Sequence, residues 1–379
     1  MSSLTTSDVK LKNKENLIQY IYQQKCTHQM QICEALHLSR PTVIPMIREC
    51  EEKGIIEKNG FYESTGGRKA NAICFIADAK IAIGVELLQD SYEITALDLY
   101  GETLNFDSYH TPFHNSDSYF KSVCSSILKF IEINSIPSEK ILGIGIVLQG
   151  LISADGYCVT YGKILDCTGL SIESFTKYLP YPCKFFHDAE AAAQDELWQS
   201  PNLHNAIYMN IRSHVSGAII VNREFLKGTE LKSGVFEHMT LVPDGRQCYC
   251  GNKGCVETYC STQSLLENAY SLDNFFTKLH RGDPGCKKIW MHYLKYLASS
   301  INNLHMFIDY PVIIGGTLSP YLQGRDISTL HQMIYNITAF PTEKEFIKPS
   351  CCPNSPISRG AALPYIRKYL KTIVGDQLN

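Results

Sequence analysis

Apolar positions in the first sixty residues recur at helical spacing and then give way to a short alternating stretch. This spacing predicts helices over 13–24, 28–36 and 40–53, marked by Leu17, Ile18, Ile21, Tyr22, Ile32, Leu36, Val43, Met46 and Ile47. Ser39 is a good N-cap for the third helix, Pro41 suits its first turn, and Gly54 ends it. Residues 55–62 then read as a hairpin with an Asn59-Gly60 turn. Three helices and a hairpin predict a winged helix-turn-helix domain over residues 1–63.

Such a domain binds duplex DNA by placing its third helix in the major groove and its wing along the backbone. The residues expected to reach phosphates or bases are Ser39, Arg40, Thr42, Arg48 and Asn59. A small helical protein-interaction domain is the alternative, but the Leu-Ser-Arg-Pro-Thr-Val entry to the third helix favours DNA. Pro45 lies inside that helix, removes one backbone hydrogen bond and predicts a kink.

Beyond a linker over residues 64–79, buried strands alternate with helices in two similar halves. An apolar strand over 81–87 has a hairpin partner over 92–99, and the pattern returns at 206–211 and 217–221. Further buried strands fall at 142–148, 184–186 and 312–314, and a long helix over 286–308 fits core packing or a dimer surface. We therefore expect an α/β body of two lobes over residues 80–379, with a central cleft.

Composition and charge narrow the class of protein. The chain is 44% hydrophobic and 19% charged, which is typical of a globular protein, and it lacks both a membrane-length apolar run and a signal-peptide pattern. We expect a cytoplasmic protein with no membrane partner. The net charge of −3 argues against indiscriminate nucleic-acid coating. Residues 1–70 nevertheless hold 10 Lys and Arg against 8 Asp and Glu, which permits DNA binding by the head.

The 15 cysteines are more consistent with free buried thiols and a metal site than with a disulfide framework, because the chain shows no secretion signal. Cys248, Cys250 and Cys255 lie within eight residues, separated by glycines that let the chain fold around one ion. His238 can supply a fourth ligand, and a Cys3His set is typical of a structural zinc site. Exposed thiols or a disulfide are the alternatives. Cys260 lies beyond the cluster and is expected to be buried.

These residues carry a family resemblance. His238 followed by Cys-x-Cys-Gly-x-x-Gly-Cys-x-Glu resembles the motif of the ROK family, whose name stands for repressor, open reading frame, kinase. The segments at 64–68, 143–146, 314–316 and 360–362 are also similar to ROK sequences, so the likeness spans nearly the whole chain. The resemblance implies an actin/hexokinase-like (ribonuclease H-like) body and one zinc per chain. It also implies a homodimer or homotetramer, and control of carbohydrate genes by a sugar or sugar phosphate.

Two segments depart from the kinase pattern of that family. Where ROK kinases have Asp-x-Gly-Gly-Thr for the phosphates of Mg-ATP, this chain has Glu86-Leu87-Leu88-Gln89-Asp90, and bulky leucines are expected to obstruct the phosphate. The second phosphate turn, glycine-rich in kinases, reads His214-Val215-Ser216-Gly217-Ala218. Both phosphate sites therefore look disabled, which predicts a protein that is not an enzyme.

The resemblance also points to an effector pocket. The family binds sugar with an Asn-Asp pair, a Glu three residues before the zinc His, that His, and the Glu that closes the cysteine motif. The matching positions here are His187, Asp188, Val235, His238 and Glu257. Glu237 is a possible substitute for the lost carboxylate at Val235, although its side chain is expected to point elsewhere. For Asp188 the alternative role is a helix N-cap.

Together these features favour a DNA-binding transcriptional regulator of carbohydrate genes, a repressor under the control of a sugar or sugar phosphate. One alternative is a sugar kinase with an appended DNA-binding head. Another is a regulator whose effector is not a sugar or has been lost, as the changes at His187 and Val235 allow.

Overall fold

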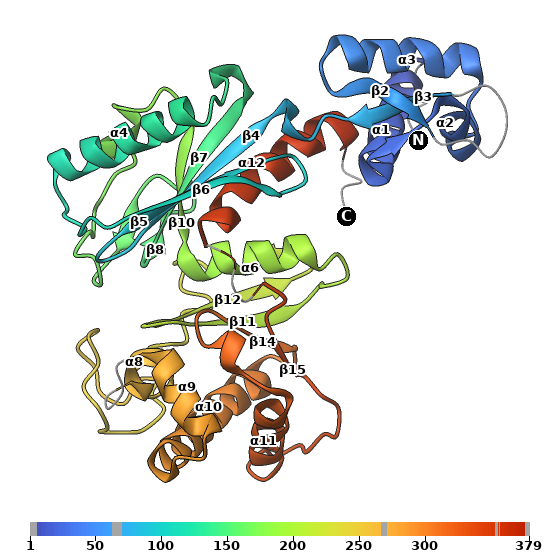
Figure 1. Cartoon of the computed structure of the whole chain (residues 1–379). Helices are drawn as coiled ribbons and strands as arrows, with labels where there is room; N and C mark the ends of the chain where they lie inside the picture. The colour runs from blue at the N-terminus through green and yellow to red at the C-terminus, as the bar shows by residue number, and fades with distance from the viewer. Residues whose placement is uncertain (1–5, 63–69, 267–270, 353–354, 356, 376–379) are drawn as a thin grey trace.

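The computed structural model describes residues 6–62, 70–266, 271–352, 355 and 357–375. They form an N-terminal head attached to a body of two α/β lobes, as Figure 1 shows. Each lobe contains a five-stranded sheet. The predicted fold class is therefore confirmed. Within the described ranges, no helix has the length and apolar character needed to cross a membrane.

The head consists of three helices and a small sheet. Its helices are α1 (Thr6–Gln24), α2 (Gln29–Leu36) and α3 (Arg40–Glu52), and its strands are β1 (Cys26–Thr27), β2 (Ile56–Tyr62) and β3 (Ala70–Phe75). α3 continues through Pro45. Ser39 stands at the N-cap position as predicted, but its hydroxyl pairs with the Thr42 hydroxyl at 2.9 Å rather than capping the backbone.

The wing differs from the predicted hairpin. Residues 56–62 form the single strand β2, and its partner is β3, which falls inside the predicted linker. Asn59 and Gly60 lie at an irregularity in the β2–β3 register, with Gly60 at φ 71°. The predicted Asn59-Gly60 turn is therefore wrong, because an Asn-Gly pair also suits a bulge. Residues 64–69, the ROK-like junction, lie outside the described residues.

One disulfide joins the head's strands. Cys26 of β1 and Cys74 of β3 are antiparallel partners, and their sulfur atoms are bonded. This pair departs from the expectation of free thiols. The thirteen other cysteines are free.

The first lobe is built on a sheet of order β10-β7-β4-β5-β6. Its strands are β4 (Ile81–Leu87), β5 (Tyr92–Leu97), β6 (Thr103–Tyr109), β7 (Ile141–Leu148) and β10 (Cys183–His187). Helix α4 (Asp117–Ile133) packs its apolar stripe against one face. Small elements complete the lobe: η1 (Ala77–Ala79), η2 (Ser138–Lys140), β8 (Leu151–Ile152), β9 (Val159–Tyr161) and α5 (Glu173–Thr176).

The second lobe repeats this plan with the sheet order β13-β12-β11-β14-β15. The strands are β11 (Ala206–Ile211), β12 (Val215–Val221), β13 (Glu224–Phe225), β14 (Val312–Gly315) and β15 (Ile347–Pro349). One face of this sheet is covered by helices, among them α9 (Leu272–His280), α10 (Pro284–Phe307) and α11 (Gly324–Tyr335). The short elements of the lobe are α7 (Glu257–Cys260), α8 (Thr262–Leu265) and η3 (Ser319–Tyr321). In both sheets two antiparallel pairings precede two parallel ones, so the predicted repeat is present.

Helices α6 (Asp188–Gln199) and α12 (Ile357–Val374) lie between the two sheets, as Figure 1 shows. Their contact is close because Gly360 of α12 lies against the backbone of Ala191 in α6. A Cβ added at Gly360 would be 1.7 Å from the Ala191 carbonyl oxygen. Gly84 of β4 brings α12 equally near to the first sheet, where an added Cβ would meet the Ser358 carbonyl oxygen at 1.7 Å. These glycines fix the position of α12 relative to both lobes.

The far end of α12 completes the core of the head. One buried cluster combines residues of the head with residues of the first lobe and of α12, including Leu17, Ile18, Ile21, Leu97, Leu99, Leu363, Ile366, Leu370 and Val374. Tyr22 of α1 stacks on Tyr100 at 4.7 Å between ring centroids, and its hydroxyl donates to the Leu99 carbonyl at 3.0 Å. Head and body are thus joined by a continuous apolar core.

Candidate effector pocket, metal cluster and DNA-binding surface

A cavity of about 780 Å³ lies where the two lobes meet. The first lobe contributes residues 149–151 and 160–164, and the second contributes residues 214–216 and part of the segment 230–252. His187 and Asp188, at the junction of β10 and α6, complete the wall. A volume of this size suits a small molecule.

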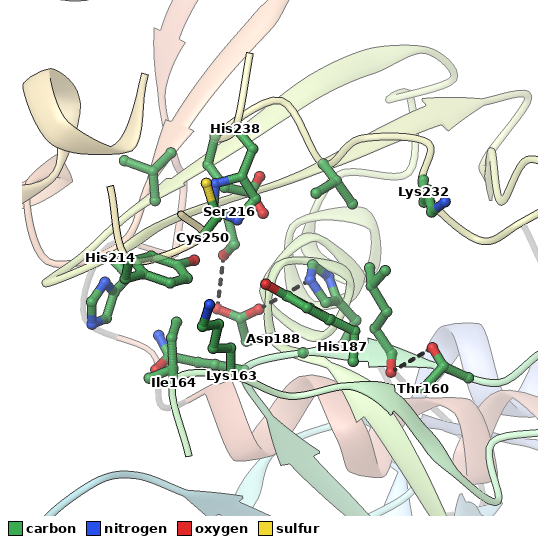
Figure 2. A pocket seen from close by; sticks show the side chains of 18 of the residues that line it. Thr160, Lys163, Ile164, His187, Asp188, His214, Ser216, Lys232, His238 and Cys250 are labelled. Carbon is green, nitrogen blue, oxygen red and sulfur yellow. Dashed lines mark hydrogen bonds and ion pairs between the residues drawn. The ribbon is translucent and has the colours of Figure 1, made fainter. Parts of the chain in front are cut away.

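Asp188 is held deep in this cavity by the second lobe. Its Oδ2 accepts hydrogen bonds from the Ser216 hydroxyl at 2.7 Å and the Asn210 amide at 3.3 Å. The His187 Nε2 lies 3.4 Å from its Oδ1, and Figure 2 shows Asp188 between Ser216 and His187. His187, rather than Asp188, occupies the N-cap position of α6. The carboxylate therefore faces the cavity and does not cap its own helix.

Glu237 also lines this cavity, against the expectation that it points elsewhere. Its side chain is buried, and its Oε2 is without a hydrogen-bond partner among the described residues. Burial, reinforced by Asp188 and Glu257, raises the pKa of the Glu237 carboxyl well above its usual range. Val235 lines the same cavity with an apolar side chain.

Of the four predicted effector residues, three meet at this cavity. His187, Asp188 and His238 line it, whereas Glu257 does not. The Glu257 carboxylate instead accepts from the Val215 backbone N–H at 2.6 Å and contacts the His214 Nδ1 at 2.8 Å. Its contact with the effector stays a prediction. Its observed role is to fix the turn between β11 and β12.

The predicted metal ligands form one cluster beside the cavity. The ligand atoms of His238, Cys248, Cys250 and Cys255 all lie within 4.8 Å of one another. The Cys250 and Cys255 sulfur atoms are 3.7 Å apart, and the Cys248 sulfur is 3.7 Å from the His238 Nδ1. Two thiolates bound to a tetrahedral zinc at about 2.3 Å are separated by about 3.8 Å. Burial also lowers the pKa of His238 and favours its neutral, metal-binding form. The cluster therefore fits a metal ion.

An ion pair that the sequence does not reveal joins the two lobes at the wall of a second cavity, of about 860 Å³. The Arg212 guanidinium, at the end of β11, pairs with the Glu86 carboxylate on β4 of the other lobe. Glu86 is 2% exposed in its side chain. Leu87 is buried in the core of the first lobe, and the obstruction of phosphate by Leu87 and Leu88 stays a prediction. Ser216 and Gly217 lie inside β12 rather than in a turn.

The five predicted DNA contacts are all exposed on the head. Arg48 of α3 pairs with Glu52 one turn on at 3.0 Å, and both side chains are more than half exposed. The Asn59 amide donates to the Glu57 carboxylate at 3.1 Å. Exposed pairs of this kind contribute little to stability, so Arg48 remains available to a phosphate.

The winged helical head, the two repeated α/β lobes and the cavity beside a Cys3His cluster agree with the resemblance found in the sequence. The ROK family model matches residues 82–361, and the chain belongs to the ROK family. It is 25% identical over 322 residues to the xylose repressor of Bacillus spizizenii, which covers 82% of this chain and 83% of the repressor. It is also 25% identical over 267 residues to the DNA-binding transcriptional dual regulator NagC of Escherichia coli, covering 70% of this chain and 66% of that protein.

Solved structures share the fold. A ROK family transcriptional regulator, a homologue of the Escherichia coli MLC protein, superimposes with a TM-score of 0.75 at 18% identity and covers 97% of this chain and 98% of its own. A ROK family glucokinase from Streptomyces griseus, solved with glucose and AMPPNP, gives 0.64 at 19% identity and covers 75% of this chain and 98% of its own. The regulator alone of these two covers the head as well as the body.

Proposed function

We propose that this protein is a DNA-binding transcriptional repressor of carbohydrate-related genes that responds to a sugar or sugar phosphate bound between its lobes. The relatives named as a xylose repressor and as a DNA-binding transcriptional regulator support this class. As a repressor of chromosomal genes it acts in the cytoplasm. It binds a pseudo-palindromic operator as a homodimer or homotetramer, because a single winged helix makes few contacts.

The observation that carries the proposal is the physical connection between cavity and head. Asp188 in the cavity is the first residue of α6, and α6 contacts α12 without intervening side chains at Gly360. α12 then continues into the core of the head. A ligand that changes the angle between the lobes displaces α6 and α12 together, and the head moves with α12. Ligand binding can therefore alter the spacing of two heads on DNA.

DNA binding is tested with the full chain and a fluorescent duplex of its own upstream region. We expect the double variant Arg40→Ala and Arg48→Ala to weaken binding at least tenfold and to flatten its dependence on salt. The reason is that a protein with fewer phosphate contacts releases fewer counterions from the DNA when it binds. Arg325→Ala, an exposed arginine of α11 in the body, is the matched control and should bind as the parent does. Equal affinity for parent and double variant contradicts the DNA-binding model.

Phosphoryl transfer is not expected, although kinases share the fold. Transfer requires Mg-ATP to be positioned by phosphate-binding turns. Here Glu86, which stands at the acidic position of the first turn, is paired with Arg212. Measured ATP consumption with glucose, xylose or N-acetylglucosamine should equal the background without sugar. Turnover at ordinary kinase rates would favour the alternative of a sugar kinase with a DNA-binding head.

The Cys3His cluster is proposed to hold one structural zinc through His238, Cys248, Cys250 and Cys255. Four protein ligands leave no open position, so the ion stabilises the loop and takes no part in chemistry. His238 lines the cavity as well as the cluster, which connects the metal loop to the effector.

A further inference from the structure

Two carboxyl oxygens in the cavity lack hydrogen-bond partners among the described residues. They are the Oε2 of Glu237 and the Oδ1 of Asp188, and both side chains are buried. The His187 Nε2 lies 3.4 Å from the Asp188 Oδ1, so the Glu237 Oε2 is the more isolated of the two. A buried polar atom without a partner costs on the order of 1–3 kcal/mol. Each such atom in a native protein calls for an explanation. Because both residues line the cavity, a ligand hydroxyl group could supply the missing bond.

The position of Glu237 is fixed by the backbone around it. Its carbonyl accepts from the Glu257 N–H at 2.8 Å, and its neighbour His238 belongs to the metal cluster. On the other side, Phe236 fills the space over Gly217, where an added Cβ would lie 2.0 Å from its ring. Phe236 is thereby held in the core, and Glu237, the next residue, lies in the adjoining turn among the residues that line the cavity.

We infer that Glu237 is a specificity-determining residue that receives a hydroxyl group of the effector, in place of the carboxylate missing at Val235. This inference rests on the proposed function. The ligand it selects is a carbohydrate that places adjacent hydroxyls against Asp188 and Glu237. Opposite Val235 the same ligand carries a group that needs no hydrogen bond, because a hydroxyl group buried against an apolar side chain without a partner would weaken binding.

The test is calorimetric titration of the full-length, metal-loaded protein with xylose, glucose, N-acetylglucosamine and N-acetylglucosamine 6-phosphate. For the sugar that binds most tightly, Glu237→Met should raise Kd about tenfold or more, since it keeps the volume but removes both oxygens. Glu237→Gln retains a hydrogen-bonding oxygen and should stay within about threefold of the parent. The same Glu237→Met variant should melt at a higher temperature, because it removes a buried carboxyl without a partner.

Glu173→Gln is the matched control. Glu173 is exposed on α5 and does not line the cavity, so this change should leave Kd unchanged. Deoxy analogues provide a second measurement. Removing the hydroxyl that Glu237 receives should weaken binding to the parent and have no further effect on the methionine variant.

The inference is overturned if Glu237→Met binds sugar as the parent does, if Glu173→Gln weakens binding equally, or if the parent binds no sugar of the panel. Its failure is separable from failure of the proposed function. A Glu237→Met protein that keeps its affinity for the upstream duplex shows that the repressor assignment stands while the ligand assignment falls. If the Arg40→Ala and Arg48→Ala double variant binds DNA as the parent does, the repressor assignment falls, whatever the effect of Glu237→Met on sugar binding.

Discussion

Arg212→Ala should destabilise the body substantially, because the guanidinium neutralises a buried carboxylate. The Glu86 side chain on β4 is 2% exposed. Its neighbour on the adjacent strand β5 is Glu93, a second acidic residue. Breaking a buried ion pair by removing one partner costs about 3–5 kcal/mol. For a body of this size that corresponds to a decrease in melting temperature on the order of 10 °C.

The loss should depend on pH with a definite sign. Burial and Glu86 raise the pKa of Glu93, and Arg212 opposes this. Removing Arg212 therefore raises that pKa further in the folded state. The pKa of such an acid is higher in the folded protein than in the unfolded chain. It destabilises the fold increasingly as the pH rises from the unfolded pKa to the folded pKa, and it has its full effect above the folded pKa. The gap in melting temperature between Arg212→Ala and the parent should thus be larger at about pH 8 than at about pH 5.

The assay is thermal unfolding followed by circular dichroism, with the double variant Glu86→Leu and Arg212→Met as its control. Replacing both members of a buried pair with apolar residues is often neutral or stabilising, so the double variant should melt near the parent. An Arg212→Ala protein that melts within about 1 °C of the parent at about pH 8 would refute the reasoning. The reasoning would equally fail if the double variant were as unstable as the single one.

Two further predictions concern the metal loop and the contact between α6 and α12. Cys250→Ser should abolish bound zinc and lower the melting temperature, because zinc affinity contributes to folding. Cys33→Ser changes a free thiol in the head and should have neither effect. A full zinc content of the Cys250→Ser protein, measured by elemental analysis, would contradict the proposed ligand set. Gly360→Ala should cost about 1–3 kcal/mol in denaturant unfolding despite better helix propensity, since the added methyl meets backbone. Gly324→Ala is the control and should not destabilise the protein, because no atom lies within 4 Å of the added methyl group. Equal stability of the two variants would show that α12 can shift to make room at Gly360.

Local signals in the sequence predict much of the fold. Helical periodicity places the three helices of the head, and apolar runs place seven strands of the two sheets within a few residues. The edge strands β6, β13 and β15 are not predicted. The cysteine spacing predicts the metal cluster because four ligands from eighteen residues must lie near one another. The wing is the exception. Its second strand, 70–75, follows a segment rich in glycine, and the Asn59-Gly60 pair is a turn signal that the structure uses as a bulge.

The features that the sequence does not reveal depend on contacts between distant residues. Arg212 and Glu86 are 126 positions apart, and neither has a local pattern that indicates the other. Glu237 illustrates a second reason. Its direction depends on the packing of Phe236 against Gly217, and motif comparison alone points to Val235 as an empty position. Side-chain direction within an irregular loop has no periodicity from which it can be read.

The shared core between α1 and α12 has a consequence for synthesis on the ribosome. Residues 6–62 emerge first, but the apolar face of α1 is covered in part by Leu370 and Val374, which emerge more than 300 residues later. The head therefore waits, with this surface exposed, until nearly the whole described chain has been made. A nascent or truncated product that lacks α12 retains the residues of α3 but not the support beneath them. We expect such fragments to bind the operator weakly and to be degraded readily, because the apolar surface of α1 stays exposed.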